Sequence, residues 1–211
     1  MANYIKYPRT YHLPWSLGFS SDDKVLKSVE HFEGQKVVVT EKMDGENTTM
    51  YSDRVYARSI DSNGGEDRAW VKQLWSTIRG EIPKGWRICG ENLYARHSLP
   101  YDDLQSYFYG FSVWDEHNQC LPWVDTLEIF SMLEITPVRT LYCGKWDEGH
   151  LRELAIKLDT SKVEGYVVRT AGGFPYNEFS LNAAKFVRAN HVQTDKHWRH
   201  SALIPNTLAT I

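Results

Sequence analysis

The sequence predicts a single α+β domain built on two antiparallel β-sheets flanked by helices. Segments with strand composition outnumber helical segments and follow one another as hairpins. The 211 residues are enough for one sizeable core but few for two. A content of 42% hydrophobic and 13% aromatic residues is too high for a disordered chain. We therefore expect one domain over 1–211, with 1–35 as an N-terminal extension packed on it and 190–211 as a basic C-terminal segment.

Strands are predicted wherever Val, Ile, Tyr or Phe dominate a short run. The segments that meet this condition are 36–42, 48–52, 55–59, 86–91, 107–115, 164–169 and 183–189. The first of them ends shortly before Asp44-Gly45, a dipeptide typical of tight turns between extended segments. A hairpin is therefore expected between the first two strands.

Helices are predicted where apolar side chains recur every three or four residues. Within 66–79, Trp70, Leu74 and Ile78 lie four residues apart, and Gly80 follows as a stop signal. The other segments with an apolar stripe at this spacing are 123–133 and 147–158. These stripes predict core-facing helix surfaces rather than sites.

Composition and missing motifs exclude several classes of protein. No apolar run is long enough for a membrane span, and the N-terminus lacks the apolar region and cleavage site of a signal peptide. We expect a cytoplasmic protein, in the host cytoplasm if the source is viral. Three widely separated cysteines argue against a disulfide framework and a CxxC zinc site. The P-loop, GxGxxG and HExxH patterns are absent.

Charge is unevenly distributed along the chain. The net charge of −3 gives no general attraction for nucleic acid, so a polyanion would have to meet a local basic patch. One basic stretch lies near the C-terminus and carries Lys185, Arg188, Lys196 and Arg199. It predicts either phosphate binding or a solvated basic tail.

The octamer TEKMDGEN, residues 40–47, places a lysine at the end of an apolar strand. If that strand is extended, Val38, Thr40 and Lys42 share one face. Glu164 enters a second predicted strand, in EGYVVR. A lysine and a glutamate at such points need water, each other or a ligand. The alternative for Lys42 is a strand-end lysine that reaches solvent beside the turn.

Five motifs in order carry a resemblance to a known superfamily. EKMDGEN, GENLYARHS, YFYGFSVWD, EGYVVR and AAKFVRANH have the order and approximate spacing found in the covalent nucleotidyltransferases, the polynucleotide ligases and mRNA capping enzymes. More narrowly, residues 36–198 resemble the ATP-dependent RNA ligases. The resemblance implies the ligase adenylation-domain fold, which is ATP-grasp-like, with ATP between two antiparallel sheets.

The resemblance also implies roles for individual residues. Lys42 would attack the α-phosphorus of ATP to form lysyl-AMP, with its pKa lowered by desolvation and a nearby metal. Glu164 would hold Mg²⁺ or Mn²⁺, unless it is a surface acid. Glu91 would bind the ribose, and Phe111 would stack on adenine unless it is plain core.

Further positions of the motifs match residues that act on the nucleotide or the RNA. Asn47 and Arg58 would lie around AMP and the RNA ends, and Arg58 could instead be a surface arginine. Lys185 would take part in catalysis and contact the α-phosphate. The other residues expected at the nucleotide are Glu41, Asp44 and Val167, and those expected to bind RNA are Arg58, Lys196 and Arg199.

The chain departs from the resemblance in two ways. The last motif commonly has two lysines on one strand face, but the neighbours of Lys185 at two residues are Ala183 and Val187. Arg188 would face the opposite way unless a bulge redirects it. Few residues follow the last motif, so we expect a minimal form without an OB domain.

The function expected from these features is ATP-dependent RNA ligation. The enzyme would transfer AMP from Lys42 to an RNA 5′-phosphate and seal that end to a 3′-OH, using ATP and Mg²⁺ or Mn²⁺. We expect it to act as a monomer and not at a membrane. The alternatives are an mRNA-capping-type guanylyltransferase and a noncatalytic RNA-binding relative.

Overall fold

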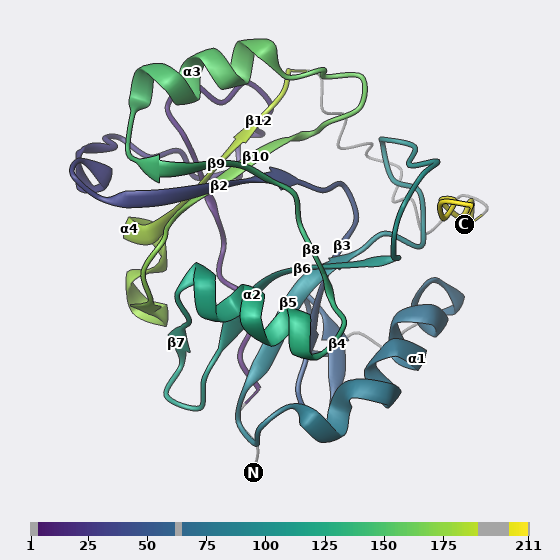
Figure 1. Ribbon diagram of the computed structural model, residues 1–211. Coiled ribbons are helices and arrows are strands. Elements are labelled where there is room, and N and C mark those ends of the chain that lie inside the picture. Colours follow the sequence, from purple (N-terminus) through teal and green to yellow (C-terminus); the bar gives the residue numbers. More distant parts are fainter. Residues whose placement is uncertain (1–3, 62–64, 190–202, 211) are drawn as a thin grey trace.

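The protein folds into two β-sheets that face each other, as the computed structural model shows for residues 4–61, 65–189 and 203–210 (Figure 1). Within this part of the chain, the first sheet has five strands in the order β1-β12-β10-β2-β9. Their bounds are β1 Tyr11–His12, β12 Ala183–Val187, β10 Gly165–Thr170, β2 Lys36–Lys42 and β9 Thr140–Lys145.

The second sheet runs in the order β11-β7-β6-β5-β3-β4, and β8 pairs with β6 beside this path. The bounds of these strands are β11 Phe174–Pro175, β7 Gln119–Cys120, β6 Phe108–Trp114, β5 Arg87–Asn92, β3 Glu46–Met50, β4 Val55–Ala57 and β8 Thr136–Pro137. The chain passes from the first sheet to the second between β2 and β3. The KMDG turn therefore lies where the two sheets meet.

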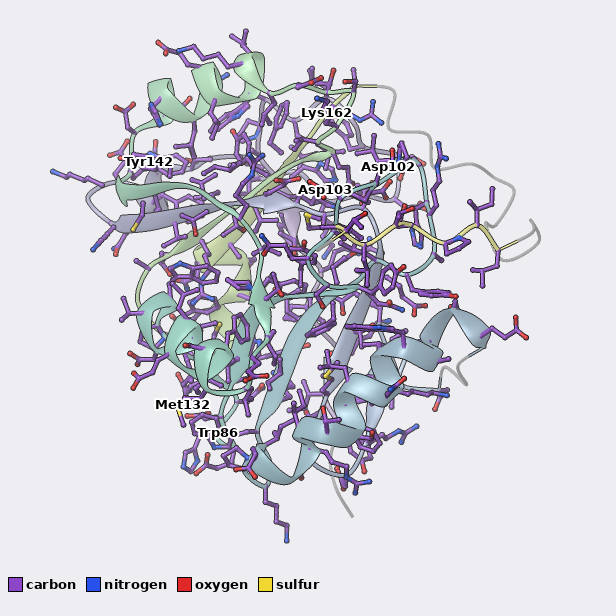
Figure 2. The ribbon with its side chains drawn as sticks, turned by 45° about the vertical axis from the view of Figure 1, so that its right-hand side comes forward. Trp86, Asp102, Asp103, Met132, Tyr142 and Lys162 are labelled. Carbon is purple, nitrogen blue, oxygen red and sulfur yellow. The ribbon has the colours of Figure 1, made fainter. Side chains whose placement is uncertain are left out.

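The three ten-residue helices cover the outer faces of the sheets, whereas the four-residue helix lies between the levels of the two sheets (Figure 1). Their bounds are α1 Ala69–Ile78, α2 Trp123–Met132, α3 Glu148–Lys157 and α4 Phe179–Asn182, and single 3₁₀ turns occur at Glu30–Phe32, Glu66–Arg68, Arg79–Glu81 and Tyr176–Glu178. Helix α3 begins where the Asp147 side chain accepts a hydrogen bond from the His150 backbone N–H, 2.9 Å away. Met132, at the end of α2, remains exposed (Figure 2).

Alternation along β2 explains how the first sheet serves both a core and a site. Val37 and Val39 are fully buried in a cluster with Leu151 of α3. Val38 points the other way, into a cluster that also contains Met43. Because successive side chains of a strand face opposite sides, Thr40 and Lys42 follow Val38 toward the space between the sheets.

The predicted fold class is confirmed. Every predicted strand is present with ends within two residues of the expected ones, and the three predicted helices correspond to α1, α2 and α3. Two pairings differ from the antiparallel expectation, because β1 lies parallel to β12 and β8 lies parallel to β6. In the described residues, no helix is long and apolar enough to cross a membrane.

Candidate active site

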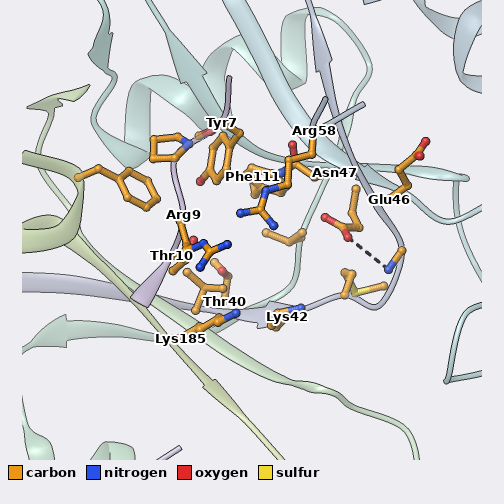
Figure 3. Close-up of a pocket in the computed structure, with 18 of the residues that line it drawn as sticks. Tyr7, Arg9, Thr10, Thr40, Lys42, Glu46, Asn47, Arg58, Phe111 and Lys185 are labelled. Atoms are coloured by element: carbon orange, nitrogen blue, oxygen red, sulfur yellow. Dashed lines mark hydrogen bonds between the residues drawn. The ribbon is translucent and has the colours of Figure 1, made fainter. Parts of the chain in front are cut away.

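A cavity of about 940 Å³ lies between the two sheets and contains most of the expected site residues. The first sheet contributes Thr40, Lys42, Val167 and Lys185, and the second contributes Asn47, Glu91 and Phe111. The N-terminal segment from Lys6 to Thr10 supplies a further wall (Figure 3). Residues that are far apart in the sequence therefore meet around one space.

Lys42 ends β2 on the cavity wall, where its partner across the strands is Gly165. Its Nζ lies 2.5 Å from Oε2 of Glu164, a residue that is only 2% exposed. Burial acts to lower the pKa of Lys42, but the negative charges of Glu164 and Glu91 outweigh it, so the pKa is raised. Desolvation thus acts in the expected direction but is outweighed by the acidic neighbours, and the expected effect of a nearby metal stays a prediction.

Glu91 sits on β5 directly opposite Asn47 of β3. Its Oε1 accepts a hydrogen bond from the backbone N–H of Gly45 at 3.2 Å. A side chain at Gly45 would bring a Cβ within 2.5 Å of the Asn92 carbonyl oxygen, which explains the glycine of the KMDG turn. Burial raises the pKa of Glu91 to about 8, against the lowering effect of Lys42.

Phe111 lies on β6 and lines the cavity while half-buried. Its ring meets the edge of the Tyr7 ring with centroids 5.2 Å apart. It also packs against core residues, including the buried Cys89. Both expected roles, an aromatic surface for a base and a core contact, are compatible with this position, so adenine stacking stays a prediction.

Asn47 and Arg58 line the same cavity from the second sheet (Figure 3). The Oδ1 atom of Asn47 is buried and has no hydrogen-bond partner within the described residues. A buried amide oxygen of this kind calls for a ligand or water donor. Arg58 follows β4 and is exposed, with its guanidinium group directed into the cavity (Figure 3).

Lys185 lies on β12 opposite Val167 of β10 and beside His12 of β1. Its Nζ is 3.9 Å from Oδ1 of Asp23. Burial and the nearby Lys42 charge lower the pKa of Lys185 to about 8. The residues two positions away on the same face of β12 are Ala183 and Val187, both buried. This face of β12 therefore carries Lys185 as its one lysine.

Arg188 does not line the cavity. Its backbone N–H donates to the carbonyl oxygen of Glu164 at 3.0 Å. The absence of its side chain from the cavity wall agrees with the expectation that it faces away from the face of β12 that carries Lys185. Lys196 and Arg199, the other cations expected to bind RNA, lie outside the described residues.

Two acids of the KMDG region differ in their surroundings. Glu41 lines the cavity, and its Oε2 accepts from Nε of Arg139 at 2.8 Å. Asp44 is not among the cavity residues; its Oδ2 accepts from the backbone and hydroxyl of Ser98 and from the backbone N–H of Leu99, at 2.6–2.9 Å. Asp44 therefore anchors the 98–99 loop, and its contact with nucleotide stays a prediction.

Sequence reasoning missed several residues of the cavity wall. Lys6, Tyr7, Arg9 and Thr10 line it, as does Asp23 from a later part of the same N-terminal region. No periodicity or motif marks them, because long-range contacts place them at the site, namely the pairing of β1 with β12 and the hydrogen bonds of Ile5 with Tyr51 and Tyr56. The signal that could have found them is the concentration of basic residues in KYPRT.

The donor set near Lys42 suits a cation shared with phosphate. Within the described residues, no group of three or more Asp, Glu, His or Cys side chains could hold a metal ion by itself. Mg²⁺ is often bound by one or two carboxylates together with substrate phosphates and waters. The buried carboxylate of Glu164 beside Lys42 fits a site of that kind.

The sequence matches the RNA ligase family over residues 35–187. The chain belongs to the RNA ligase family. The matched region includes Lys42, Glu91, Glu164 and Lys185, so the family resemblance found in the motifs is confirmed. Comparison with curated protein sequences found no match.

Solved RNA ligases share the fold at low sequence identity. A Naegleria gruberi RNA ligase with pyrophosphate matches with a TM-score of 0.59 and 18% identity, over 88% of this chain and 61% of that one. An archaeal ATP-dependent RNA ligase matches with a TM-score of 0.57 and 16% identity, over 86% of this chain and 48% of that one. A mutant of the Naegleria ligase with ATP and Mn matches with a TM-score of 0.58 and 16% identity, over 87% of this chain and 60% of that one. The chain thus spans about half to three fifths of these relatives.

Proposed function

We propose that this member of the RNA ligase family is an ATP-dependent RNA ligase that works through a lysyl-AMP intermediate. The observation that carries the proposal is that Lys42, on the wall of a cavity that Glu91 and Lys185 also line, contacts the buried Glu164 behind that wall. A nucleophile, an acid and a cation thereby surround a space large enough for a nucleotide. The solved relatives with ATP and Mn, or with pyrophosphate, support this assignment.

The first step is attack by Lys42 on the α-phosphorus of ATP. Lys42 attacks as a neutral amine, so its ammonium proton first passes to solvent; the N–P bond then forms as the bond from the α-phosphorus to the pyrophosphate leaving group breaks. Glu164 and Glu91 hold the proton on Lys42 in the protein alone, because they raise its pKa. Mg²⁺ or Mn²⁺ at Glu164 would supply positive charge that weakens this hold and neutralises the phosphates.

Other cavity residues would position the nucleotide. Lys185 faces the same space and would stabilise negative charge on the α-phosphate. Glu91 would accept hydrogen bonds from the ribose hydroxyls, and Phe111 would stack on the adenine. Asn47 has a buried oxygen ready to accept a hydrogen bond from the ligand.

The later steps transfer AMP to an RNA 5′-phosphate and join that end to a 3′-OH with release of AMP. Arg58, at the exposed side of the cavity, would contact the RNA end together with Lys196 and Arg199. A monomeric state and a cytoplasmic location are part of the same proposal. A guanylyltransferase would instead form a GMP adduct, and a noncatalytic relative would form none.

The test is the intact mass of the protein after incubation with ATP and Mg²⁺, followed by sealing of RNA with 5′-phosphate and 3′-OH ends. We expect one AMP adduct, and none with Lys42→Ala, which stays folded because Val37 to Val39 supply the core contacts of β2. Lys36→Ala, at the exposed start of the same strand, is the matched control and should form the adduct. Normal adduct yield with Lys42→Ala would exclude Lys42 as the nucleophile.

A further inference from the structure

The N-terminal segment bridges the two sheets across the cavity. At one end, Ile5 is bound to the second sheet, since its carbonyl accepts from Tyr56 Oη at 2.9 Å and its N–H donates to Tyr51 Oη at 3.3 Å. At the other end, β1 pairs with β12 of the first sheet, with His12 beside Lys185. Residues between these two attachments line the cavity.

The middle of the segment is also fixed. The Tyr7 ring contacts Phe111 and Phe179 edge-on, with centroids 5.2 and 5.5 Å apart. The Tyr176 hydroxyl donates to the Lys6 carbonyl oxygen at 2.8 Å. Arg9 therefore projects from a backbone held on both sides rather than from a free end.

Arg9 and Arg58 approach the same space from different walls. Figure 3 shows both guanidinium groups directed into the cavity, Arg9 from the N-terminal segment and Arg58 from the residue after β4. Arg9 donates to the Asp22 carbonyl oxygen at 2.6 Å, and no described acidic side chain is paired with either arginine. Burial and Lys42 lower the pKa of Lys185, and the charge of Arg58 adds to this effect. Cations that converge in this way repel one another unless an anion lies between them.

Phosphate is the anion that suits two arginines. Each planar guanidinium can donate two parallel hydrogen bonds to phosphate oxygens. The first sheet provides one lysine on the relevant face of β12, because Val187 is apolar and buried. A triphosphate bound with its α-phosphorus at Lys42 would therefore need further positive charge from outside that strand.

We propose that Arg9 and Arg58 form a phosphate subsite that holds the β- and γ-phosphates of ATP and then the pyrophosphate product. The assignment rests on the proposed ligase function, but the subsite itself is defined by the two arginines. Arg9 is a binding residue in this scheme, supplied by a segment that precedes every recognised motif. Its role is to hold the leaving group while Lys42 forms the bond to the α-phosphorus.

Binding of inorganic pyrophosphate to the full chain, freed of bound AMP, tests the subsite by calorimetry. We expect Arg9→Ala and Arg58→Ala each to weaken binding roughly tenfold, and Arg9→Lys to weaken it less, since it keeps the charge but loses the paired donors. Arg152→Ala is the matched control, because Arg152 stacks on Trp15 and bonds Glu148 of α3, away from the cavity. Undetectable binding by the wild-type protein, or unchanged binding by a folded Arg9→Ala protein, would overturn the subsite.

Two further measurements distinguish the source of the phosphate and the two proposals. Arg9→Ala should raise the ATP concentration needed for half-maximal AMP adduct, yet seal a pre-adenylated RNA at the wild-type rate. If Arg9→Ala instead loses only the preference for 5′-phosphorylated over 5′-hydroxyl RNA, the assignment to ATP is wrong. Absence of any adduct in the wild-type protein would defeat the ligase proposal, while pyrophosphate binding would still decide the subsite.

Discussion

At the scale of single residues, the contact between Lys42 and Glu164 joins the proposed nucleophile to the proposed metal ligand. A carboxylate 2.5 Å from Nζ raises the pKa of Lys42, and the proposal makes the same carboxylate the ligand of the cation. The two roles oppose each other. A cation bound at Glu164 would offset the negative charge of that carboxylate and so reduce its effect on the pKa of Lys42. Metal binding would therefore help to release the nucleophile as well as to neutralise phosphate.

Glu164→Ala tests this link. We expect the variant to form no AMP adduct with Mg²⁺, because the cation loses its protein ligand, and to recover part of the yield at high Mn²⁺. Adduct yield at several metal concentrations measures both effects. Glu153→Ala removes an exposed carboxylate on α3 and should behave as the wild type. A yield indifferent to the substitution and to the metal would contradict the metal role.

Phe111→Leu separates the two roles that the position of Phe111 allows. A stack on adenine is worth about 1 kcal/mol, so its loss should raise the ATP concentration for half-maximal adduct roughly fivefold. The thermal midpoint should change little by comparison. Phe108→Leu, a fully buried residue on the same strand, should do the opposite and lower the midpoint more than the affinity. If Phe111→Leu behaves like Phe108→Leu, Phe111 belongs to the core.

At the scale of elements, the sequence predicted strands with strong apolar patterns and missed those without one. β2 has three fully buried valines and was expected within its observed bounds. β9 has no fully buried side chain, so its composition gives only a weak strand signal. β1 has two residues and pairs with β12 in parallel, a contact that no local pattern predicts. The same difference applies to the site. Lys42 and Lys185 lie in recognised motifs and were predicted, whereas Arg9 lies in the segment just before β1 and was not.

The attachment of β1 includes a buried histidine that should make stability depend on pH. His12 is 1% exposed, with Nδ1 2.8 Å from Ser16 Oγ and Nε2 3.7 Å from Asp23 Oδ1. Burial and the Lys185 and Lys42 charges lower its pKa to about 4, although Asp23 acts the other way. Between pH 6.5 and about 4 the unfolded chain binds a proton that the folded chain does not, so stability falls as pH decreases.

His12→Gln should remove part of that dependence. The free energy of unfolding, measured with denaturant at several pH values, should fall less steeply below pH 6.5 in the variant than in the wild type. The matched control is His117→Gln, because the His117 side chain is 76% exposed and should leave the slope unchanged. Equal slopes for the wild type and His12→Gln would show that His12 is not the group responsible.

At the scale of the whole molecule, the proposed binding of RNA to a chain with a net charge of −3 would depend on local cations. The cavity gathers several of them, since Lys6, Arg9, Arg58 and Lys185 all line it. Described residues on either side of the 190–202 segment form backbone hydrogen bonds with residues of the recognised motifs. Arg188 donates its N–H to the Glu164 carbonyl oxygen, and the Ile204 carbonyl oxygen accepts from the backbone of Arg96. The basic C-terminal segment, with Lys196 and Arg199, is the proposed source of further cations for RNA.

Combined replacement of Lys196 and Arg199 by alanine tests that region. Lysine adenylation should be spared, because the proposed ATP site is the cavity, whereas Lys185→Ala should already fail at that step. Sealing of RNA should weaken, and the slope of log affinity against log salt should fall by roughly 1 to 2, since two phosphate contacts are lost. The double variant Arg152→Ala with Lys157→Ala removes the same net charge from exposed positions on α3 and should change neither property. Normal sealing across the salt series would make the segment a solvated tail and move the RNA-binding face to Arg58 and Arg96.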